Sequence, residues 1–389
     1  MPIDGEPAGR RPGSMFLREL EGIPLGEIAG QVGGASLVEA RKALAESPLS
    51  LRGAAILLGA ARGPLLTELL ERAGRVASER FGRCVLLYAP CYVSSFCVNH
   101  CRYCGFNFKM PIRRRQLTPS ETLAETALLV AQGFRRVLLV AGEYPSKVSR
   151  QYLSGAIGAM RSLVPEVDLE VGPAAEEDYD AWGRAGAAGL VCYQETYQRE
   201  PYALLHPRGP KSRYEFRLGT VERAGRAGMC RLGLGVLLGL ANPVVDLLAV
   251  IAHARFLARE FPRARITVSL PRLRPAVPSF RPAYVVDRES LVLYYALLRL
   301  ALPDVGLVVS TRESAELRGR LLQVGATQMS AGSVTTPGGY ASGERGGGQF
   351  EIADQRSPKE VVRDLESQGY RVIWRGGAVV ADSSGAAWA

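Results

Sequence analysis

The stretch Cys91-Tyr-Val-Ser-Ser-Phe-Cys97-Val-Asn-His-Cys101-Arg-Tyr-Cys104-Gly-Phe-Asn-Phe-Lys-Met110 lies near the start of a region of alternating strands and helices, which follows a helical first part of the chain. Cys97, Cys101 and Cys104 have the spacing C-x3-C-x2-C. Three thiols this close can bind one metal centre from a single loop, but they cannot complete four-coordination. The spacing therefore predicts a centre with one position open for chemistry.

Two other interpretations of these cysteines are open. A structural zinc site would take His100 or Cys91 as its fourth ligand, although zinc ligands usually come as two spaced pairs. A disulfide is disfavoured because the chain has seven cysteines, an odd number, and no apolar signal core near its start. We expect an iron–sulfur cluster with three cysteine ligands and one unligated iron.

Eight short apolar runs follow one another from Cys84 onward, separated by segments with helical periodicity. Many are β-branched, and their spacing is that of parallel βαβ units. Eight such units over about 250 residues predict an α/β fold, a (β/α)8 barrel of the TIM type, with an open doubly wound sheet as the alternative. The runs are 85–93, 136–141, 168–172, 190–193, 232–238, 266–270, 306–310 and 327–331.

Functional side chains of such a barrel lie just after each strand, at its C-terminal end. The cysteine stretch follows the first run, and polar or glycine residues follow or end most of the others, so we expect one shared mouth. These residues are Gly142, Glu143, Glu195, Gly235, Arg272, Arg274, Arg312 and Ser330.

The barrel region is flanked by two further parts. Residues 1–14 are rich in glycine, proline and charge, which predicts a disordered tail, and residues 16–80 have helical spacing with a break at Gly63-Pro64. After the barrel come a glycine-rich loop, a helix over 358–368 and a weakly patterned end. The expected divisions are 1–80 for the tail and helical extension, 81–334 for the barrel, and 335–389 for the C-terminal loop, helix and tail.

The net charge of +10 comes mainly from arginines scattered along the chain. The dense run Arg113-Arg114-Arg115 is either a solvated face or a set of anchors near an anionic ligand. No nucleic-acid motif accompanies the charge, so we do not expect nucleic-acid binding. No apolar run is long enough to span a bilayer and the cysteines suit a reducing compartment, so we expect a cytoplasmic protein with no membrane partner.

The cysteine spacing, with Tyr103 before the last cysteine, resembles the signature of the radical S-adenosylmethionine (SAM) superfamily. The phrase from Tyr92 to Phe106 is similar to a narrower group, the aromatic amino acid lyases, which includes the 2-iminoacetate synthases, HydG and the tryptophan lyase NosL. The chain resembles the 2-iminoacetate synthase family best, through Gly-Glu-Tyr-Pro-Ser-Lys-Val, Tyr-Gln-Glu-Thr-Tyr and Pro-Gly-Gly-Tyr. No cysteine follows Cys230, which disfavours the second cluster of HydG. The chain departs from the family after Trp374, where the family tends to have an ending of the Lys-Asp-Trp-Asp type and this chain has Arg375-Gly376-Gly377.

This resemblance implies a [4Fe–4S] cluster on the three cysteines, with SAM bound at the open iron through its amino and carboxylate groups. The amino group needs acceptors, the carboxylate needs a cation that can grip it in bidentate fashion, and the ribose needs a carboxylate or amide. The residues expected in these roles are Gly142 and Glu143 for the amino group, Arg272 or Arg274 for the carboxylate, Glu195 for the ribose and Gly235 near the adenine.

By the same resemblance Arg312 would hold the carboxylate of the substrate amino acid, with Ser330 as a neighbouring polar contact. Such an anchor would orient the substrate amino group, and orientation is what a protein can add to radical chemistry. The alternative for Arg312 is a structural ion pair with Glu313 or Glu316.

The implied activity is that of a tyrosine lyase. SAM is cleaved to methionine and a 5′-deoxyadenosyl radical, the radical takes a hydrogen from the amino group of tyrosine, and the Cα–Cβ bond breaks to give dehydroglycine (2-iminoacetate) and p-cresol. Dehydroglycine would pass to thiazole synthase in thiamine biosynthesis, and an electron donor such as flavodoxin or ferredoxin would be needed. The alternatives are the same chemistry on tryptophan or another aromatic amino acid, and a non-enzymatic scaffold whose cysteines hold zinc.

Overall fold

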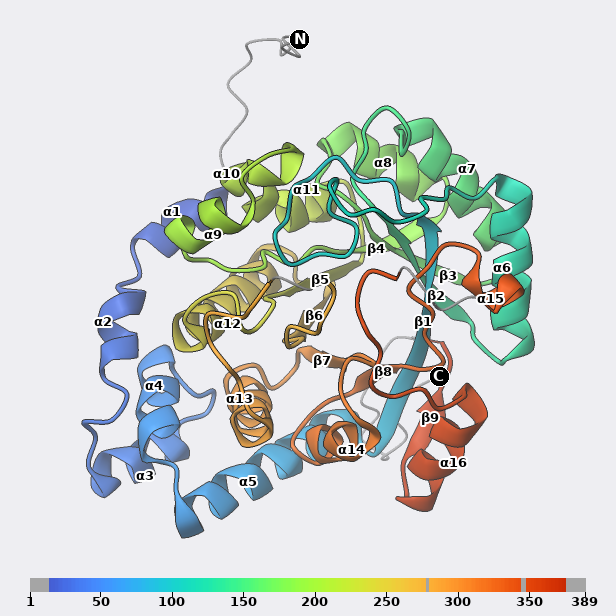
Figure 1. The fold of residues 1–389 in the computed structure, drawn as a ribbon. Coiled ribbons are helices and arrows are strands. Elements are labelled where there is room, and N and C mark those ends of the chain that lie inside the picture. Colours follow the sequence, from blue (N-terminus) through green and yellow to red (C-terminus); the bar gives the residue numbers. More distant parts are fainter. Residues whose placement is uncertain (1–13, 278–279, 344–347, 376–389) are drawn as a thin grey trace.

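A parallel sheet that closes on itself forms the centre of the molecule (Figure 1). The computed structural model describes residues 14–277, 280–343 and 348–375, and within these residues the sheet has nine strands. Strands β2 to β8 are neighbours in sequence order, and β1 closes the ring by pairing with both β8 and β2. The strands are β1 (Cys84–Ser94), β2 (Arg136–Ala141), β3 (Glu166–Glu170), β4 (Ala187–Val191), β5 (Arg231–Gly235), β6 (Arg265–Ser269), β7 (Gly306–Val309), β8 (Gln328–Ser330) and β9 (Arg371–Ile373).

The predicted (β/α)8 barrel is confirmed, because closure of the ring through β1 excludes an open doubly wound sheet. Each of the eight predicted runs overlaps one of the strands β1 to β8. Strands β3 and β4 begin earlier than predicted, since the charged Glu166 and the small Ala187 and Gly189 give no apolar signal. Strand β9 was not predicted, and it pairs with the first residues of β1, ahead of the segment that pairs with β2.

Helices cover the outside of the barrel (Figure 1). At least one helix lies between each two consecutive strands from β1 to β8 in the chain. Their apolar faces meet the outward side chains of the sheet in one large core. The helices are α6 (Pro119–Ala131), α7 (Arg150–Arg161), α8 (Glu176–Arg184), α9 (Arg199–Leu205), α10 (Tyr214–Leu218), α11 (Thr220–Arg226), α12 (Pro243–Glu260), α13 (Arg288–Ala301), α14 (Ala315–Gln323), α15 (Gly339–Ser342) and α16 (Pro358–Ser367), with a 3-10 turn η1 (Pro210–Ser212) between α9 and α10.

The first part of the described chain is helical, as predicted. Helix α5 packs against α13, and α2 and α4 pack against α12, so these helices extend the outer layer on one side of the barrel (Figure 1). The predicted break is present, since α4 ends at Ala60 and α5 begins at Gly63. The helices are α1 (Met15–Glu21), α2 (Leu25–Gly30), α3 (Leu37–Ala45), α4 (Leu51–Ala60) and α5 (Gly63–Phe81).

Local signals account for the ends of several elements. Helix α16 starts with a reciprocal capping box between Ser357 and Glu360, which confirms the predicted helix and its start. Ser14, predicted as part of a tail, instead caps α1 by accepting a hydrogen bond from the backbone of Leu17 at 3.1 Å. The other predictions for residues 1–13 and for 376–389 lie outside the described residues.

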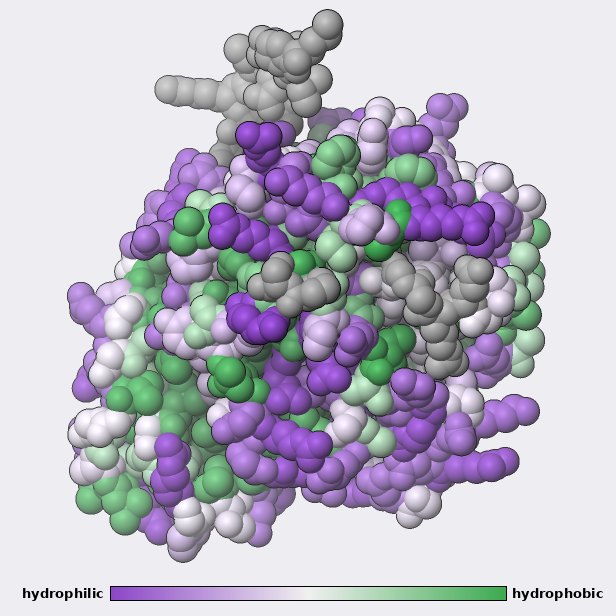
Figure 2. Space-filling view, in the orientation of Figure 1, coloured by the Kyte–Doolittle hydropathy of each residue, from purple (hydrophilic) through white to green (hydrophobic). Residues whose placement is uncertain are grey.

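The barrel mouth faces the viewer in Figures 1 and 2. Hydrophilic side chains cover most of its rim, and a hydrophobic area lies at the lower left, over the N-terminal helices. Leu37 and Val38 of α3 are among the exposed large hydrophobic side chains. None of the helices in the described residues is both long and apolar enough to cross a bilayer.

Candidate active site

The cysteine loop leaves the end of β1 and lies over the barrel mouth. The side chains of Cys97 and Cys101 are buried, and that of Cys104 is partly exposed. Polar hydrogens approach two of the sulfurs, from the side-chain amide of Asn99 to Cys97 Sγ (3.7 Å) and from the backbone N–H of Phe106 to Cys104 Sγ (3.4 Å). Such donors stabilise thiolate charge and tune a metal centre that thiolates bind.

Burial raises the pKa of the Cys101 and Cys104 thiols. Within the described part of the chain, no three His, Cys, Asp or Glu side chains converge on a position for a single metal ion. In a [4Fe–4S] cluster each cysteine binds a different iron atom. The sulfur ligands of a cluster therefore need not converge on one point.

The end of β2 is fastened directly to the cysteine loop. The backbone N–H of Val98 donates to the carbonyl of Glu143 (2.9 Å), and the amide of Asn99 donates to the Glu143 carboxylate (2.6 Å). A Cβ at Gly142 would lie 2.4 Å from the carbonyl oxygen of Phe96 and 3.2 Å from Cβ of Cys97. Glycine therefore allows the loop to lie against the strand end, and Gly142 and Glu143 belong to one unit with the cysteines.

A buried group of charges follows β4. Glu195 has a left-handed backbone (φ 72°), unusual for a non-glycine residue, and its carboxylate accepts from Lys211 Nζ at 2.6 Å and from Arg217 at 3.4 Å. Burial alone would raise the pKa of Glu195, but the charges of Lys211 and Arg217 outweigh it and lower the pKa to about 2. Glu195 is therefore ionised at neutral pH, with two buried cations beside it.

These groups line a single cavity beside the three cysteines. Its walls carry the predicted residues Gly142, Glu143 and Glu195, and also Lys211 and Arg217, which were not predicted. A zwitterion bound in this cavity could place its cationic group near a carboxylate and its anionic group near a cation.

Arg312 follows β7 and Ser330 ends β8, on the opposite side of the barrel from β3 and β4. The guanidinium carbon of Arg312 lies 3.3 Å from the centre of the Phe350 ring, and the Ser330 hydroxyl accepts from the backbone N–H of Thr311 at 3.1 Å. The structural alternative for Arg312 is not realised, because Glu313 pairs with Arg272 and Glu316 with Arg288.

The remaining predicted residues lie outside the cavity beside the cysteines, as its lining shows. Arg272 donates to both carboxylate oxygens of Glu313 and to the carbonyl of Val286 (2.9 Å), so its guanidinium is occupied. Gly235 lies inside the barrel, where a Cβ would meet the carbonyl oxygen of Ser269 at 2.1 Å. A side chain at this position of β5 would clash with β6, so the packing of the barrel alone requires glycine here.

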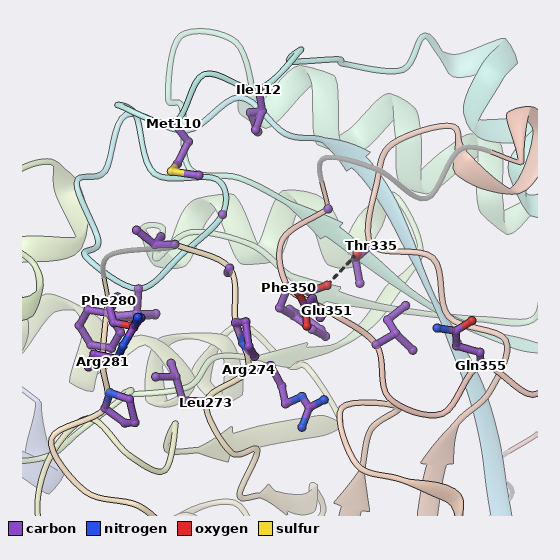
Figure 3. Close-up of a pocket in the computed structure, with 18 residues that line it drawn as sticks. Met110, Ile112, Leu273, Arg274, Phe280, Arg281, Thr335, Phe350, Glu351 and Gln355 are labelled. Atoms are coloured by element: carbon purple, nitrogen blue, oxygen red, sulfur yellow. Dashed lines mark hydrogen bonds between the residues drawn. The ribbon is translucent and has the colours of Figure 1, made fainter.

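A wide outer cleft of about 980 Å³ lies beyond the cysteine loop (Figure 3). Met110 and Ile112 line it from the loop, Arg274 from the segment after β6, and Phe350 and Glu351 from the C-terminal segment. Arg274 makes no ion pair among the described residues, and its Nε is buried without a hydrogen-bond partner. Of the two arginines predicted to hold the SAM carboxylate, Arg274 therefore lines this cleft, whereas Arg272 is paired with Glu313.

Comparisons with known proteins agree with this geometry. Residues 91–248 match the family model of the radical SAM superfamily, and residues 269–371 match that of the Biotin and Thiamin Synthesis associated domain. The chain is 36% identical over 350 residues to the 2-iminoacetate synthase of Escherichia coli K12, covering 90% of this chain and 93% of that protein. It belongs to the 2-iminoacetate synthase family. The family of the cysteine motif and the resemblance to aromatic amino acid lyases are thereby confirmed.

Two further relatives support the assignment. The 2-iminoacetate synthase of Salmonella typhimurium LT2 is 35% identical, with the same coverage of 90% and 93%. The X-ray structure of the FeFe-hydrogenase maturase HydG from Carboxydothermus hydrogenoformans matches with a TM-score of 0.85 at 34% identity, over 92% of this chain and 84% of that one. A 2-iminoacetate synthase family member is a radical SAM lyase that uses a [4Fe–4S] cluster and SAM.

The residues of this family member fit those cofactors. Three cysteines on one loop would supply thiolates and leave one iron free, and the charged cavity beside them would suit the amino, carboxylate and hydroxyl groups of SAM. The unpredicted Lys211 and Arg217 lie on η1 and α10, in the crossover after β4, so a search confined to strand ends misses them.

Proposed function

We propose that this chain is a tyrosine lyase that forms 2-iminoacetate and p-cresol. The observation that carries the proposal is its similarity to the 2-iminoacetate synthase of E. coli along nearly the whole chain. The match of residues 269–371 to the Biotin and Thiamin Synthesis associated domain supports a role in thiamine biosynthesis.

Cys97, Cys101 and Cys104 would hold the [4Fe–4S] cluster. When bound, the cluster supplies the electron that cleaves SAM into methionine and the 5′-deoxyadenosyl radical. Glu143 and Glu195 offer acceptors for the amino group and ribose of SAM. Arg217 is a better candidate than Arg272 for its carboxylate, because Arg217 lines the cavity beside the cysteines and Arg272 does not.

Arg312 would anchor the carboxylate of tyrosine by a bidentate contact, with the Phe350 ring fixing the plane of the guanidinium. A fixed carboxylate limits the positions that the neighbouring amino group can take. Ser330 is buried beside Thr311, where its hydroxyl stabilises the turn that carries Arg312. Together these residues would orient the amino group for hydrogen abstraction.

The reaction balances without an added oxidant. Tyrosine contains the atoms of p-cresol and 2-iminoacetate together, so breaking the Cα–Cβ bond needs no other substrate atom. The cleavage of SAM takes one electron, and a second electron and a proton complete p-cresol. We propose that a small redox protein such as flavodoxin or ferredoxin supplies these electrons, and that thiazole synthase accepts 2-iminoacetate.

The function is tested by giving the reconstituted enzyme tyrosine, tryptophan and phenylalanine in competition, with SAM and reductant, under anaerobic conditions. We expect p-cresol to form at the expense of tyrosine while the other two amino acids remain. Cleavage of tryptophan in preference to tyrosine would replace the proposed substrate. Stoichiometric zinc with no iron in the anaerobically purified protein would support the scaffold alternative.

A further inference from the structure

Strand β3 directs three carboxylates into the barrel, one in each layer, because alternate residues of a barrel strand point inward. The lower two are neutralised. Asp168 accepts from Arg136 at 2.7 Å and from Arg231 at 2.8 Å, and Glu166 lies 3.4 Å from Arg231. Glu170, in the top layer, makes no hydrogen bond or ion pair with any residue that the structure describes.

Glu170 lines the cavity beside the three cysteines. It stands opposite Arg312, because β3 and β7 are four strands apart in a ring of eight. Burial raises the pKa of Glu170 to about 7, and the charge that opposes this rise most strongly is that of Arg312. The charge of Arg312 therefore acts on Glu170 across the mouth, although the two form no ion pair and Arg312 lies outside the cavity that Glu170 lines.

We propose that Glu170 binds the α-amino group of the amino acid whose carboxylate Arg312 holds, and that it accepts a proton from that group. The inference rests on the proposed function, since it takes the substrate to be an α-amino acid. A zwitterion carries an ammonium next to a carboxylate, so a carboxylate on β3 and a guanidinium after β7, on opposite sides of the mouth, can each bind one group of its head. The aromatic side chain then extends away from both.

The proton transfer has a chemical purpose. An N–H bond of the ammonium breaks, an O–H bond forms on Glu170, and the electron pair stays on nitrogen as the lone pair of a neutral amine. Loss of a hydrogen atom from an ammonium would leave a radical cation, whereas loss from a neutral amine leaves a neutral radical. An acceptor that titrates near neutral pH is suited to this transfer.

Several other ionisable groups of the mouth act on Glu170 or are acted on by it. They are Glu195, Lys211 and Arg217 from the crossover after β4, Tyr88 and Tyr92 from β1, Tyr193 from the end of β4, and Arg312 from β7. The cations Lys211 and Arg217 lower the pKa of Glu170 and are themselves bound to Glu195. Of the three carboxylates that line this cavity, Glu195 is paired with these cations and Glu143 accepts a hydrogen bond from Asn99. Glu170 is the one without a hydrogen bond or ion pair to a described residue.

Binding measurements on the reconstituted holoenzyme with SAM, under anaerobic conditions and without reductant, test the assignment. Equilibrium dialysis would compare tyrosine with tyramine, which lacks the carboxylate, and with 3-(4-hydroxyphenyl)propanoate, which lacks the amino group. We expect Glu170→Gln to weaken tyrosine and tyramine by about tenfold or more, the worth of one charge-assisted hydrogen bond, and to leave the propanoate unchanged. Arg312→Gln should give the mirror pattern and spare tyramine.

Glu177→Gln on α8 is the matched control, because Glu177 is exposed and the charge change is the same. It should bind all three ligands as the wild type does. Unchanged SAM affinity in Glu170→Gln would show that the variant is folded.

An equal loss for all three ligands would overturn the assignment, and so would a fall in SAM affinity with tyrosine unaffected. A wild-type enzyme that binds SAM but not tyrosine would refute the proposed substrate and this inference with it. A wild type that binds tyrosine, with a Glu170→Gln variant that binds it equally well, would refute the inference alone.

Discussion

Substitution of Gly142 by alanine tests whether the end of β2 positions the cluster ligands. The added Cβ would lie 2.4 Å from the Phe96 carbonyl oxygen and 3.2 Å from Cβ of Cys97, whereas ordinary contact begins near 3.4 Å. The loop or the strand must therefore move by about 1 Å. Metal ligands tolerate errors of only about 0.2 Å, so we expect Gly142→Ala to lose most of its cluster.

The assay is the iron and sulfide content after anaerobic reconstitution, together with the visible absorbance of the cluster. Far-ultraviolet circular dichroism would show that the barrel is intact. Gly158→Ala is the matched control, because a Cβ added at Gly158 on α7 would have nothing within 4 Å, so this variant should keep a full cluster. A full complement of iron and sulfide in Gly142→Ala would refute the argument that the loop is fixed by contact with β2.

The remaining predictions concern the charges of the mouth and the ring beside Arg312. Glu195→Gln leaves the buried Lys211 without its counterion, so the free energy of unfolding should fall by about 3 kcal/mol. An unchanged urea concentration at the midpoint of unfolding would contradict the pairing. The pKa of Glu195 is lowered to about 2, so its stabilising contribution is present above its ordinary value of 4.5 and is lost as the pH falls toward 2. The pKa of Glu170 is raised to about 7, so its contribution is present below 4.5 and is lost as the pH rises toward 7. In the absence of amino acid, Glu170→Gln should therefore melt higher than wild type at about pH 8 and equally at about pH 4, and the opposite order would refute this sign. Phe350→Ala removes the ring beneath Arg312, a contact worth about 1 kcal/mol. The KM for tyrosine should therefore rise about fivefold, with little change in kcat. An unchanged KM in steady-state kinetics would show that the ring does not position Arg312.

Most of the barrel could be predicted because buried parallel strands are apolar on both faces. Strand β3 shows where this signal weakens. Its inward residues Glu166, Asp168 and Glu170 are acidic, and only pairing with arginines from β2 and β5 makes the lower two compatible with burial. Those partners are distant in the sequence. The alternation of acidic residues in this strand is a signal that the sequence analysis did not use.

The candidate site was predictable where its parts are close in the sequence. The three cysteines lie on one loop, and Gly142-Glu143 directly follows a strand. Arg272 is different, because its engagement with Glu313 depends on how the segments after β6 and β7 meet. Arg217 was missed for a related reason, since it reaches the mouth from a helix in a long crossover.

Turnover of tyrosine by the reconstituted enzyme in heavy water tests the central claim most directly. Exchange places deuterium on the nitrogen and oxygen atoms of tyrosine, while its carbon-bound hydrogens remain. With SAM and reductant under anaerobic conditions, mass spectrometry should find p-cresol together with 5′-deoxyadenosine that has gained one deuterium. Unlabelled 5′-deoxyadenosine without p-cresol would show that hydrogen is taken from carbon and would contradict the assignment as a tyrosine lyase that acts at the amino group.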